Sequence, residues 1–308
     1  MTCTAISAAI KLLIGGFWSS MNSLSDRQYK VTLVMNNLWR RIYTDLDGTL
    51  LDHHSYDWAP AAPLLLECAR RDILVIPNTS KTADELEQWL VKLDLPGYGV
   101  AENGGMILLP AEHDYWRGHQ PDWEGQRVLG VLMTRPYGAI CQWLDENRTR
   151  HEFRFTGFHD VDVDTVVAWT GLSAADAALA MRRQCGEPLL WEDDAEAFER
   201  FAELARSDGW TVARGGRFVH LGDAVDKSTA MRWLESHLPE PGHALALGDG
   251  ENDRAMLEAA DSAVVIRNAR GEHLALTRDD ALYTRAAGPE GWVEGVHHWL
   301  VQEGVINN

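Results

Sequence analysis

Two aspartates, Asp45 and Asp47, stand one residue apart in the segment TDLDGT at 44–49, directly after a strand-like apolar stretch. Side chains two residues apart in an extended strand point the same way. Two bare carboxylates that close repel each other, and a cation such as Mg²⁺ would let both stay ionised. One carboxylate could then attack a phosphate while the other transfers a proton. The alternative for such a pair alone is two solvated acids at a strand end.

The segment PNTSKT at 77–82 carries groups that bind oxyanions. A hydroxyl from Thr79 or Ser80 and the cation of Lys81 could hold phosphate oxygens at the start of a helix, where free N–H groups favour anions. The alternative for this segment alone is an ordinary helix N-cap followed by a surface lysine.

Lys227, in the segment AVDKSTAM, stands where a helix is expected to begin. A positive charge at the N-terminus of a helix interacts unfavourably with the helix dipole. This placement therefore favours a lysine that faces an anion, and the alternative is a solvated lysine.

The segment ALGDGENDRAM at 246–256 predicts a strand that ends in a glycine-rich turn before a helix. The turn carries Asp249, Asn252 and Asp253. Carboxylate and amide oxygens are the ligands that hard cations such as Mg²⁺ prefer. The alternative is a structural turn before an N-capped helix.

Strand-like and helix-like segments alternate around these motifs. Up to residue 110 the order is strand, helix, strand, helix, strand, and from Lys227 it is helix, strand, helix, strand. This alternation predicts an α/β fold with a doubly wound, mostly parallel sheet. Asp45, Thr79 and Asp249 each follow a predicted strand, and ligands bind such sheets at the carboxyl ends of the strands.

The segment between these two parts has a different character. Residues 111–150 are rich in Trp, Gly, His and Arg without a clear period, and FHDVDVDTVVAWTGLSAADAALAMRRQ holds two helical stretches. LLWED, WTVARGG and RFVHLGD resemble strands separated by turns. We therefore expect a catalytic core at 39–110 and 218–308, interrupted by a smaller α+β domain at 111–217.

The composition excludes several classes of partner. The formal net charge is −18 over 308 residues, which disfavours binding to nucleic acid or to anionic membranes. An anionic substrate must therefore be attracted by a local cation or a metal. The four cysteines, Cys3, Cys68, Cys141 and Cys185, are scattered without metal-binding spacing. They indicate reduced thiols in a cytoplasmic protein.

The N-terminus, residues 1–38, is expected to be a disordered or non-native extension. Its apolar run at 5–18 is interrupted by Lys11 and is shorter than the roughly 20 residues that a membrane span needs. Met21 and Met35 are alternative starts. A cleaved signal peptide is the other interpretation, although no basic residue precedes the run.

The order of these motifs resembles that of the haloacid dehalogenase-like (HAD) phosphatases, which have a Rossmann-like core. The resemblance implies that Asp45 is the nucleophile and Asp47 the general acid and base. It implies that Thr79 and Lys227 bind the phosphate, and that Asp45, Asp249 and the backbone carbonyl of Asp47 hold Mg²⁺. Supporting roles for the metal and the phosphate would fall to Asn252, Asp253, Ser80 and Lys81.

The long insert resembles the C2B-type cap of the Cof-type branch, and several stretches resemble the mannosyl-3-phosphoglycerate phosphatases in particular. They are TDLDGTLLDHHSYDW, NTSKTADEL, ENGG, TGLSAADAALAMRRQCGEPLLW and GGRFVHLGD. The SKT is distinctive, because most Cof-type relatives have a glycine–arginine pair there. One departure is Gly186, where a serine or another small polar residue is expected before Glu187 and Pro188.

This second resemblance implies Mg²⁺-dependent hydrolysis of mannosyl-3-phosphoglycerate, or another 2-O-glycosyl-3-phosphoglycerate, through an aspartyl-phosphate. The partner would then be a small phosphorylated glycoside, and the product a glycosylglycerate of the compatible-solute type. The cap would supply cations for the carboxylate and polar groups for the sugar hydroxyls. The candidate substrate-binding residues are Asn103, Arg183, Glu187, Arg217 and His220.

Three alternatives remain open at this point. The first is a phosphatase with the same core that acts on another sugar phosphate. The second is a phosphotransferase similar to the phosphomannomutases, which passes the phosphoryl group to a sugar hydroxyl. The third is a catalytically silent binding protein, although Asp45, Asp47, Thr79, Lys227 and Asp249 are all present.

Overall fold

A computed structural model describes residues 39–214, 217–238 and 242–307 of the chain. The extension predicted at 1–38 lies outside the described residues. Among the described residues, no helix combines the length and apolar character that a bilayer crossing demands.

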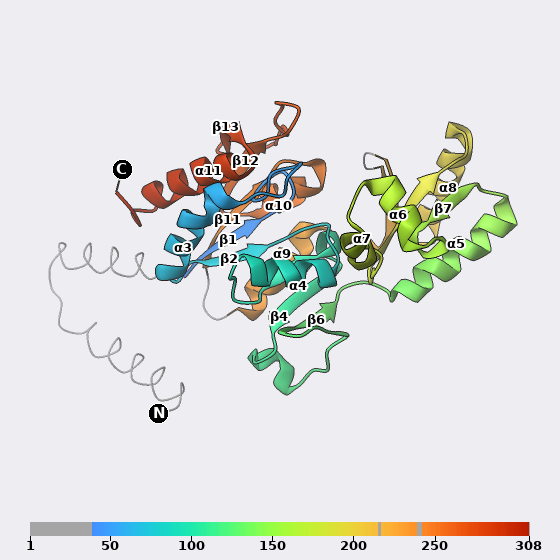
Figure 1. The fold of residues 1–308 in the computed structure, drawn as a ribbon, viewed down its shortest axis with the longest axis horizontal. Coiled ribbons are helices and arrows are strands. Elements are labelled where there is room, and N and C mark those ends of the chain that lie inside the picture. Colours follow the sequence, from blue (N-terminus) through green and yellow to red (C-terminus); the bar gives the residue numbers. More distant parts are fainter. Residues whose placement is uncertain (1–38, 215–216, 239–241, 308) are drawn as a thin grey trace. The chain divides into compact units, whose positions relative to one another are not determined.

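A five-stranded sheet in the order β13-β12-β11-β1-β2 forms the centre of the fold (Figure 1). The pairs β1–β2, β11–β12 and β12–β13 are parallel. β1, from the N-terminal part of the core, lies next to β11, from the C-terminal part. Ligands bind such sheets at the carboxyl ends of the strands where the strand order reverses, so the ends of β1 and β11 flank the expected binding point. The strands are β1 (Trp39–Thr44), β2 (Leu74–Pro77), β11 (Gly242–Gly248), β12 (Ser262–Arg267) and β13 (Leu282–Ala287).

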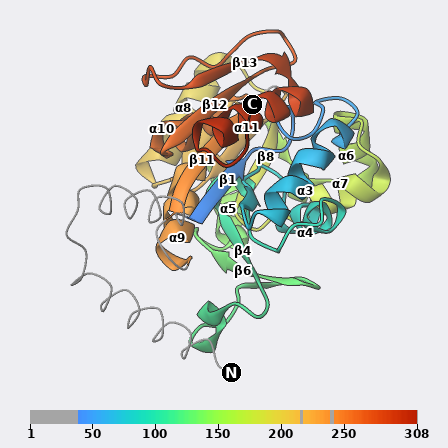
Figure 2. The same cartoon turned by 90° about the vertical axis from the view of Figure 1, so that its left-hand side faces the viewer.

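Both faces of this sheet are covered by helices, as the apolar runs of its strands require. Side chains on one face, such as Ile42 and Leu247, pack with α3, α4 and α11. Side chains on the other face, such as Tyr43 and Ala246, pack with α9 and α10. Figure 2 shows α3 and α4 on one side of β1 and β11, with α9 and α10 on the other. The helices are α3 (Ala62–Arg70), α4 (Ala83–Lys92), α9 (Lys227–His237), α10 (Arg254–Ala259) and α11 (Gly288–Gln302); the short helices η1 (Ala59–Ala61) and η5 (Glu251–Asp253) precede α3 and α10. This arrangement confirms the predicted doubly wound α/β core.

A second sheet, in the order β3-β4-β6-β5, adjoins the core. Its strands are antiparallel, and a parallel bridge between Asn78 and Val100 links it to the end of β2. Val128 and Met106 from this sheet are buried in the core cluster. The elements are β3 (Gly99–Ala101), η2 (Glu102–Gly104), β4 (Met106–Pro110), η3 (Asp114–Arg117), β5 (Trp123–Glu124) and β6 (Val128–Leu132).

The pairing of β6 with β4, and of β5 with β6, corrects the expected start of the insert at residue 111. The segment 111–133 completes a sheet beside the core rather than beginning a separate domain. Its two strands are short and separated by irregular turns, so no alternating pattern of hydrophobic residues marks them in the sequence.

The third sheet, in the order β7-β8-β10-β9, is antiparallel and is covered by α5 and α8. It confirms the three predicted strands at LLWED, WTVARGG and RFVHLGD. The helical stretches in 158–184 correspond to α6 and α7, whereas α5 was not predicted. The elements are α5 (Tyr137–His151), β7 (Phe155–Gly157), η4 (Phe158–Asp160), α6 (Val163–Thr170), α7 (Ala174–Ala180), β8 (Gly186–Trp191), α8 (Ala195–Ser207), β9 (Thr211–Arg214) and β10 (Val219–Gly222).

The last cap strand corrects the expected end of the insert at 217. β10 pairs with both β8 and β9, so the cap sheet extends to Gly222. The helix α5 was missed because it buries only Ile140, Leu144 and Asn147 along its length. Such a narrow apolar stripe leaves a weak helical period in the sequence.

The η2 turn requires a glycine at position 104. Gly104 has a φ of +107°, and a Cβ atom built there would overlap the backbone carbonyl oxygen of Asp226. We predict that Gly104→Ala lowers the free energy of unfolding by about 2 kcal/mol or more, because the residue gains both backbone strain and a clash with rigid backbone. Urea denaturation measures this change.

The matched control is Gly118→Ala. An added Cβ at Gly118 meets nothing within 4 Å, and its φ of −128° suits any residue. We expect this variant to change the free energy of unfolding by less than about 1 kcal/mol. Equal stability of the two variants would contradict the tight contact of the η2 turn with Asp226.

Candidate active site

The centre of the site is the ammonium group of Lys227. This group donates hydrogen bonds to Asp45 Oδ1 and Asp253 Oδ1, each at 2.6 Å. Asp45 directly follows β1, and its backbone N–H bonds to the carbonyl of Leu247 in β11 at 3.0 Å. Lys227 is the first residue of α9, where the Asp226 side chain caps the helix by accepting from Thr229 N–H. Residues far apart in sequence therefore meet at one edge of the sheet.

Because the Lys227 ammonium is buried, it needs charged partners inside the protein. Lys227 and Asp253 are fully buried, and Asp45 is 6% exposed. Burial lowers the pKa of Lys227, but the carboxylates of Asp253 and Asp45 outweigh it and raise that pKa above its usual value. Lys227 is therefore a permanent cation, which is what a group that holds phosphate oxygens must be.

Asp253 acts on the site through Lys227 and the loop after β11. Its Oδ2 accepts hydrogen bonds from the backbone N–H groups of Asp249 at 3.0 Å and Gly250 at 2.9 Å. Asn78 holds the other side of Lys227, donating from Nδ2 to the Lys227 carbonyl at 2.9 Å. These contacts fix the position of the lysine and the conformation of the loop.

The carboxylates around Lys227 fit a divalent cation. Oxygens of Asp45, Asp249 and Asp253 all lie within 4.8 Å of one another. Burial raises the pKa of Asp45 to about 8, even though Lys227 opposes this, and burial followed by the Asp253 charge raises the pKa of Asp249 to about 6. Three carboxylates face one lysine here, and a hard cation such as Mg²⁺ would offset the excess negative charge and favour their ionised forms.

Of these three carboxylates, Asp45 and Asp249 are the better ligands, because Asp253 already uses both oxygens. Gly48 allows the approach of Asp249: its φ is +85°, and a Cβ there would lie 2.7 Å from Asp249 Oδ2. Thr49 also donates to Asp249 Oδ1, at 3.4 Å.

Asp47 lies in a different environment from Asp45. Its Oδ2 pairs with Lys81 Nζ at 2.8 Å, while its Oδ1 is buried without a partner among the described residues. The Lys81 ammonium also lies 4.8 Å from the centre of the Tyr56 ring. Lys81 was predicted to support the phosphate, and its charge here is shared with Asp47. The half-buried Asp47 remains available for proton transfer.

The remaining predicted core residues converge on the η2 turn. The carbonyl of Thr79 accepts from Asn103 N–H at 2.9 Å, and Thr79 Oγ1 accepts from Lys81 N–H at 3.3 Å. Asn252 Nδ2 donates to Asn103 Oδ1 at 3.1 Å. The η2 turn therefore joins the phosphate-binding segment to the loop that carries Asp249. Ser80 is half-buried beside them.

Glu102, which the sequence analysis did not single out, joins the same turn to the cap. Its carboxylate accepts from the backbone N–H groups of Gln184 at 2.8 Å and Cys185 at 3.1 Å, and it pairs with Arg183 at 3.1 Å. Its φ of +49° is rare for glutamate, but position-specific strain leaves no mark in the sequence. Asn78 was missed for a similar reason, since one polar residue at a strand end is common.

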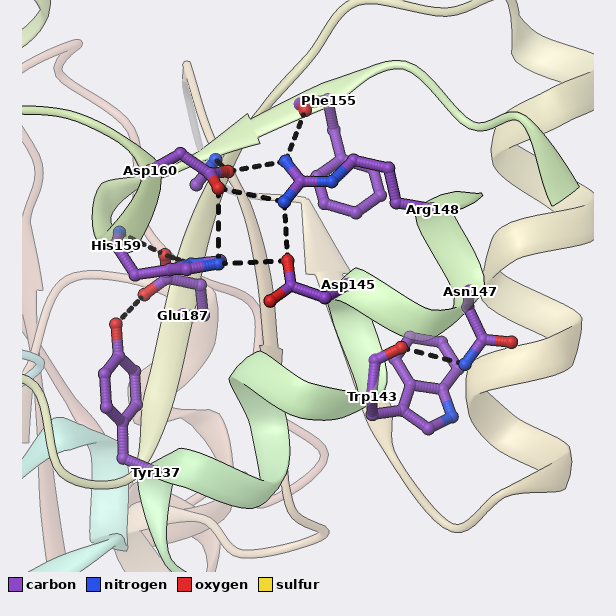
Figure 3. A network of polar contacts seen from close by, with 10 residues as sticks. Tyr137, Trp143, Asp145, Asn147, Arg148, Phe155, His159, Asp160 and Glu187 are labelled. Carbon is purple, nitrogen blue, oxygen red and sulfur yellow. Dashed lines mark hydrogen bonds and ion pairs between the residues drawn. The ribbon is translucent and has the colours of Figure 1, made fainter. Parts of the chain in front are cut away.

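The prediction that Glu187 contacts substrate hydroxyls disagrees with its complete burial. Its carboxylate accepts from Tyr137 Oη at 2.5 Å, His159 N at 2.9 Å and His159 Nδ1 at 2.8 Å (Figure 3). The bond to Glu187 raises the pKa of His159, although burial opposes it. Glu187 thus holds the cap together, because a buried carboxylate must be fully hydrogen-bonded.

Figure 3 shows that the same network continues to α5. Arg148 donates to Asp160 and Asp145, and the side chain of His159 lies between these two carboxylates and Glu187. The network ties α5, η4 and β8 together.

The other cap candidates lie on the cap surface or at its base. Arg217 and His220 are exposed. Arg183 is largely buried, pairs with Glu102 and donates from Nε to the Gly186 carbonyl at 2.9 Å. Gly186 starts β8, and a Cβ there would meet only ordinary contacts. The departure at Gly186 therefore has no steric cause.

Comparison with known proteins places this geometry in context. A family model for sucrose-6F-phosphate phosphohydrolase matches residues 214–300, which is less than half of the chain. A phosphatase of the haloalkanoate (HAD) enzyme superfamily from Bacteroides thetaiotaomicron matches with a TM-score of 0.59 at 17% identity, over 94% of this chain and 100% of that chain. The chain has the HAD fold.

Two further solved structures share this HAD fold. A sugar phosphatase of HAD subclass IIB matches with a TM-score of 0.56 at 13% identity, over 87% of this chain and 100% of that chain. The sucrose-phosphatase from Synechocystis, solved with sucrose and phosphate, matches with a TM-score of 0.51 at 14% identity, over 85% of this chain and 98% of that chain. At these identities the likeness establishes the fold, and the chemistry must be argued from the residues.

Removal of the Glu187 carboxylate tests the buried network in the cap of this HAD fold. We predict that Glu187→Ala lowers the free energy of unfolding by about 3 kcal/mol, because buried donors of Tyr137 and His159 lose their acceptor. The control is Glu196→Ala, which should change stability little, because the Glu196 side chain is 86% exposed and its one ion pair among the described residues is with Arg200. Denaturant unfolding compares them, and similar losses would contradict a structural role for Glu187.

Proposed function

We propose that the protein is a Mg²⁺-dependent phosphatase that hydrolyses a small phosphate monoester through a phosphorylated Asp45. The observation that carries this proposal is the buried Lys227 between Asp45 and Asp253, with Asp249 close enough to share a cation with Asp45. Such a site holds a nucleophile, a permanent cation and oxygen ligands around one point, as phosphoryl transfer requires.

In the first step, a carboxylate oxygen of Asp45 attacks the phosphorus. A new P–O bond forms to Asp45, the ester P–O bond breaks, and the carboxyl group of Asp47 gives its proton to the leaving alkoxide. Lys227 and the hydroxyl of Thr79 hold the oxygens of the transferring group. Mg²⁺ bound by Asp45 and Asp249, with the Asp47 backbone carbonyl, would supply further charge neutralisation when present.

In the second step, Asp47 accepts a proton from a water molecule as that water attacks the phosphorus. The bond between phosphorus and Asp45 breaks, inorganic phosphate leaves, and the carboxylate of Asp45 is restored. Lys81 pairs with Asp47 and keeps its carboxylate oriented during both transfers.

For the substrate, we propose mannosyl-3-phosphoglycerate or a close 2-O-glycosyl relative. Support comes from the motifs quoted above, from the family model for sucrose-6F-phosphate phosphohydrolase and from the HAD subclass IIB sugar phosphatase, both of which concern phosphorylated sugars. Another sugar phosphate is the first alternative, and phosphoryl transfer to a sugar hydroxyl is the second. Exposed Arg217 and His220 are the cap groups proposed to meet the substrate carboxylate.

Substitution of the two aspartates tests the chemistry. We predict that Asp45→Asn abolishes phosphate release while the protein stays folded, because an amide is a poor nucleophile. Asp47→Asn should lower kcat by about 10²-fold or more, the usual contribution of a general acid–base group. Steady-state phosphate release measures both. Turnover by Asp45→Asn, or an Asp47→Asn rate within about tenfold of wild type, would contradict the assigned roles.

Metal removal tests the cation site by two readouts. We predict that chelation stops turnover and that added Mg²⁺ raises the melting temperature of the wild-type protein, because the ion binds only the folded site. Asp249→Asn should weaken the thermal shift. An unchanged melting temperature with and without Mg²⁺, together with full activity in chelator, would exclude the proposed site.

A panel of phosphate esters tests the substrate. We expect the highest kcat/KM for mannosyl- or glucosyl-3-phosphoglycerate, measured by phosphate release, with hexose phosphates and 3-phosphoglycerate as comparisons. A higher kcat/KM for a simple hexose phosphate would favour the first alternative. Consumption of the ester without net release of phosphate would favour the transferase.

A further inference from the structure

A pocket of about 290 Å³ lies beside Lys81, the partner of Asp47, and its other lining residues have no role in the chemistry described above. Its walls come from α4, from the segment that follows the first motif and from the α7 region of the cap. The residues that line it include Tyr56, Lys81, Gln88, Trp89, Lys92 and Asp176. Its volume is close to the lower limit for pockets that bind small molecules.

Lys81 places this pocket next to the proposed reaction centre. Lys81 lines the pocket, and its ammonium group pairs with Asp47 Oδ2 at 2.8 Å and lies 4.8 Å from the centre of the Tyr56 ring. A substrate whose leaving oxygen receives the proton of Asp47 would therefore extend its leaving group towards this pocket.

Contacts between the core and the cap fix the walls of the pocket relative to each other. Residues Arg40–Asn308 form one compact unit, within which Thr82 Oγ1 donates to the carbonyl of Leu179 at 3.0 Å. Arg182 pairs with Asp84 at 2.8 Å. Both contacts join the first turn of α4 to the end of α7, so the pocket has a defined shape in this arrangement.

Two aromatic rings form part of the wall. The ring centroids of Tyr56 and Trp89 are 6.4 Å apart with 44° between their planes, and both side chains are half-buried. The Lys92 ammonium lies 4.5 Å from the centre of the Trp89 ring and restrains it. Aromatic rings offer rigid apolar surface for the C–H groups of a ligand.

The charges in the wall balance each other. Lys81 and Lys92 stand against Glu85 and Asp176, and all four already have a contact. Lys92 lies over the Trp89 ring, and Asp176 Oδ2 accepts from Ser173 Oγ at 2.7 Å. Lys81 pairs with Asp47, and the Glu85 carboxylate accepts from Thr82 N–H at 2.9 Å. Because the pocket carries no net positive charge, it does not favour a free phosphate. A purely apolar group would remove water from the polar side chains without replacing its hydrogen bonds.

We propose that this pocket is the subsite for the sugar ring of the substrate, a neutral group rich in hydroxyls; this inference rests on the proposed function. The C–H face of the ring packs on Trp89 and Tyr56. The amide of exposed Gln88, which donates and accepts, and the carboxylate of Asp176 hydrogen-bond to its hydroxyls. The subsite thus selects the glycosyl part, while the core selects the phosphate.

The direct test measures binding of 2-O-mannosylglycerate, which lacks phosphate, by saturation-transfer NMR and titration calorimetry in the full-length protein. We expect wild type to bind it, and Trp89→Ala and Gln88→Ala each to weaken binding, the former by about fivefold to tenfold. Trp89→Phe should retain most of the affinity. The control is Val91→Ala, because Val91 lies on the same helix with a side chain that is 51% exposed outside the pocket.

A kinetic test separates the pocket from the reaction. Trp89→Ala should raise KM for mannosyl-3-phosphoglycerate and leave kcat/KM for p-nitrophenyl phosphate within about twofold, because only the former ester carries a sugar. Equal losses on both esters would overturn the proposal, as would failure of wild type to bind the glycoside or unchanged binding by Trp89→Ala. Failure of the proposed function is a separate result: no ester would release phosphate, while the binding test would still decide the pocket.

Discussion

The salt bridges of Lys227 with Asp45 and Asp253 are the interactions on which the rest of the site depends. A buried ammonium needs charged partners, and the groups that hold Lys227 come from separate parts of the sequence. Asp45, which follows β1, and Asp253, which ends η5, pair with the ammonium group. Asn78, which follows β2, holds the Lys227 backbone carbonyl. The sheet order places these ends together, so the fold and the charge balance of the site have a common origin. The same balance leaves excess negative charge, which accounts for the proposed need for a divalent cation.

The η2 turn is the second constraint, because it connects this charged centre to the cap. Asn103 contacts both Asn252 and the backbone of Thr79, and its neighbour Glu102 bonds to the cap backbone at Gln184 and Cys185. Gly104 lies against the backbone of Asp226, one residue before Lys227. The η2 turn therefore links the cap backbone to the groups that are proposed to hold phosphate. This connection is a physical basis for coupling substrate recognition by the cap to the chemistry in the core.

The sequence predicted the core well because its signals are local and strong. Asp45, Thr79 and Asp249 each come after an apolar strand that can be recognised in the sequence by itself. The carboxyl ends of parallel strands lie at one edge of the sheet, so these residues are expected to lie together. The cap was harder to predict. Glu187 was assigned to substrate, but hydrogen bonds from Tyr137 and His159 bury it, and such partners are distant in sequence. The limits of the insert were misplaced because the pairing of β6 with β4 and of β10 with β8 is also a long-range property. The pocket beside Lys81 likewise combines core and cap residues that no local pattern links.

The central claim is that phosphorus becomes bonded to the carboxylate of Asp45, and it can be measured directly. The wild-type protein is mixed with substrate, quenched in acid within a single turnover, and treated with borohydride, which reduces an acyl phosphate to an alcohol. Peptide mass spectrometry then locates the reduced residue. The account predicts homoserine at position 45, dependent on substrate and absent from Asp45→Asn. Phosphate release without any reduced residue, or with the modification at another position, would contradict it.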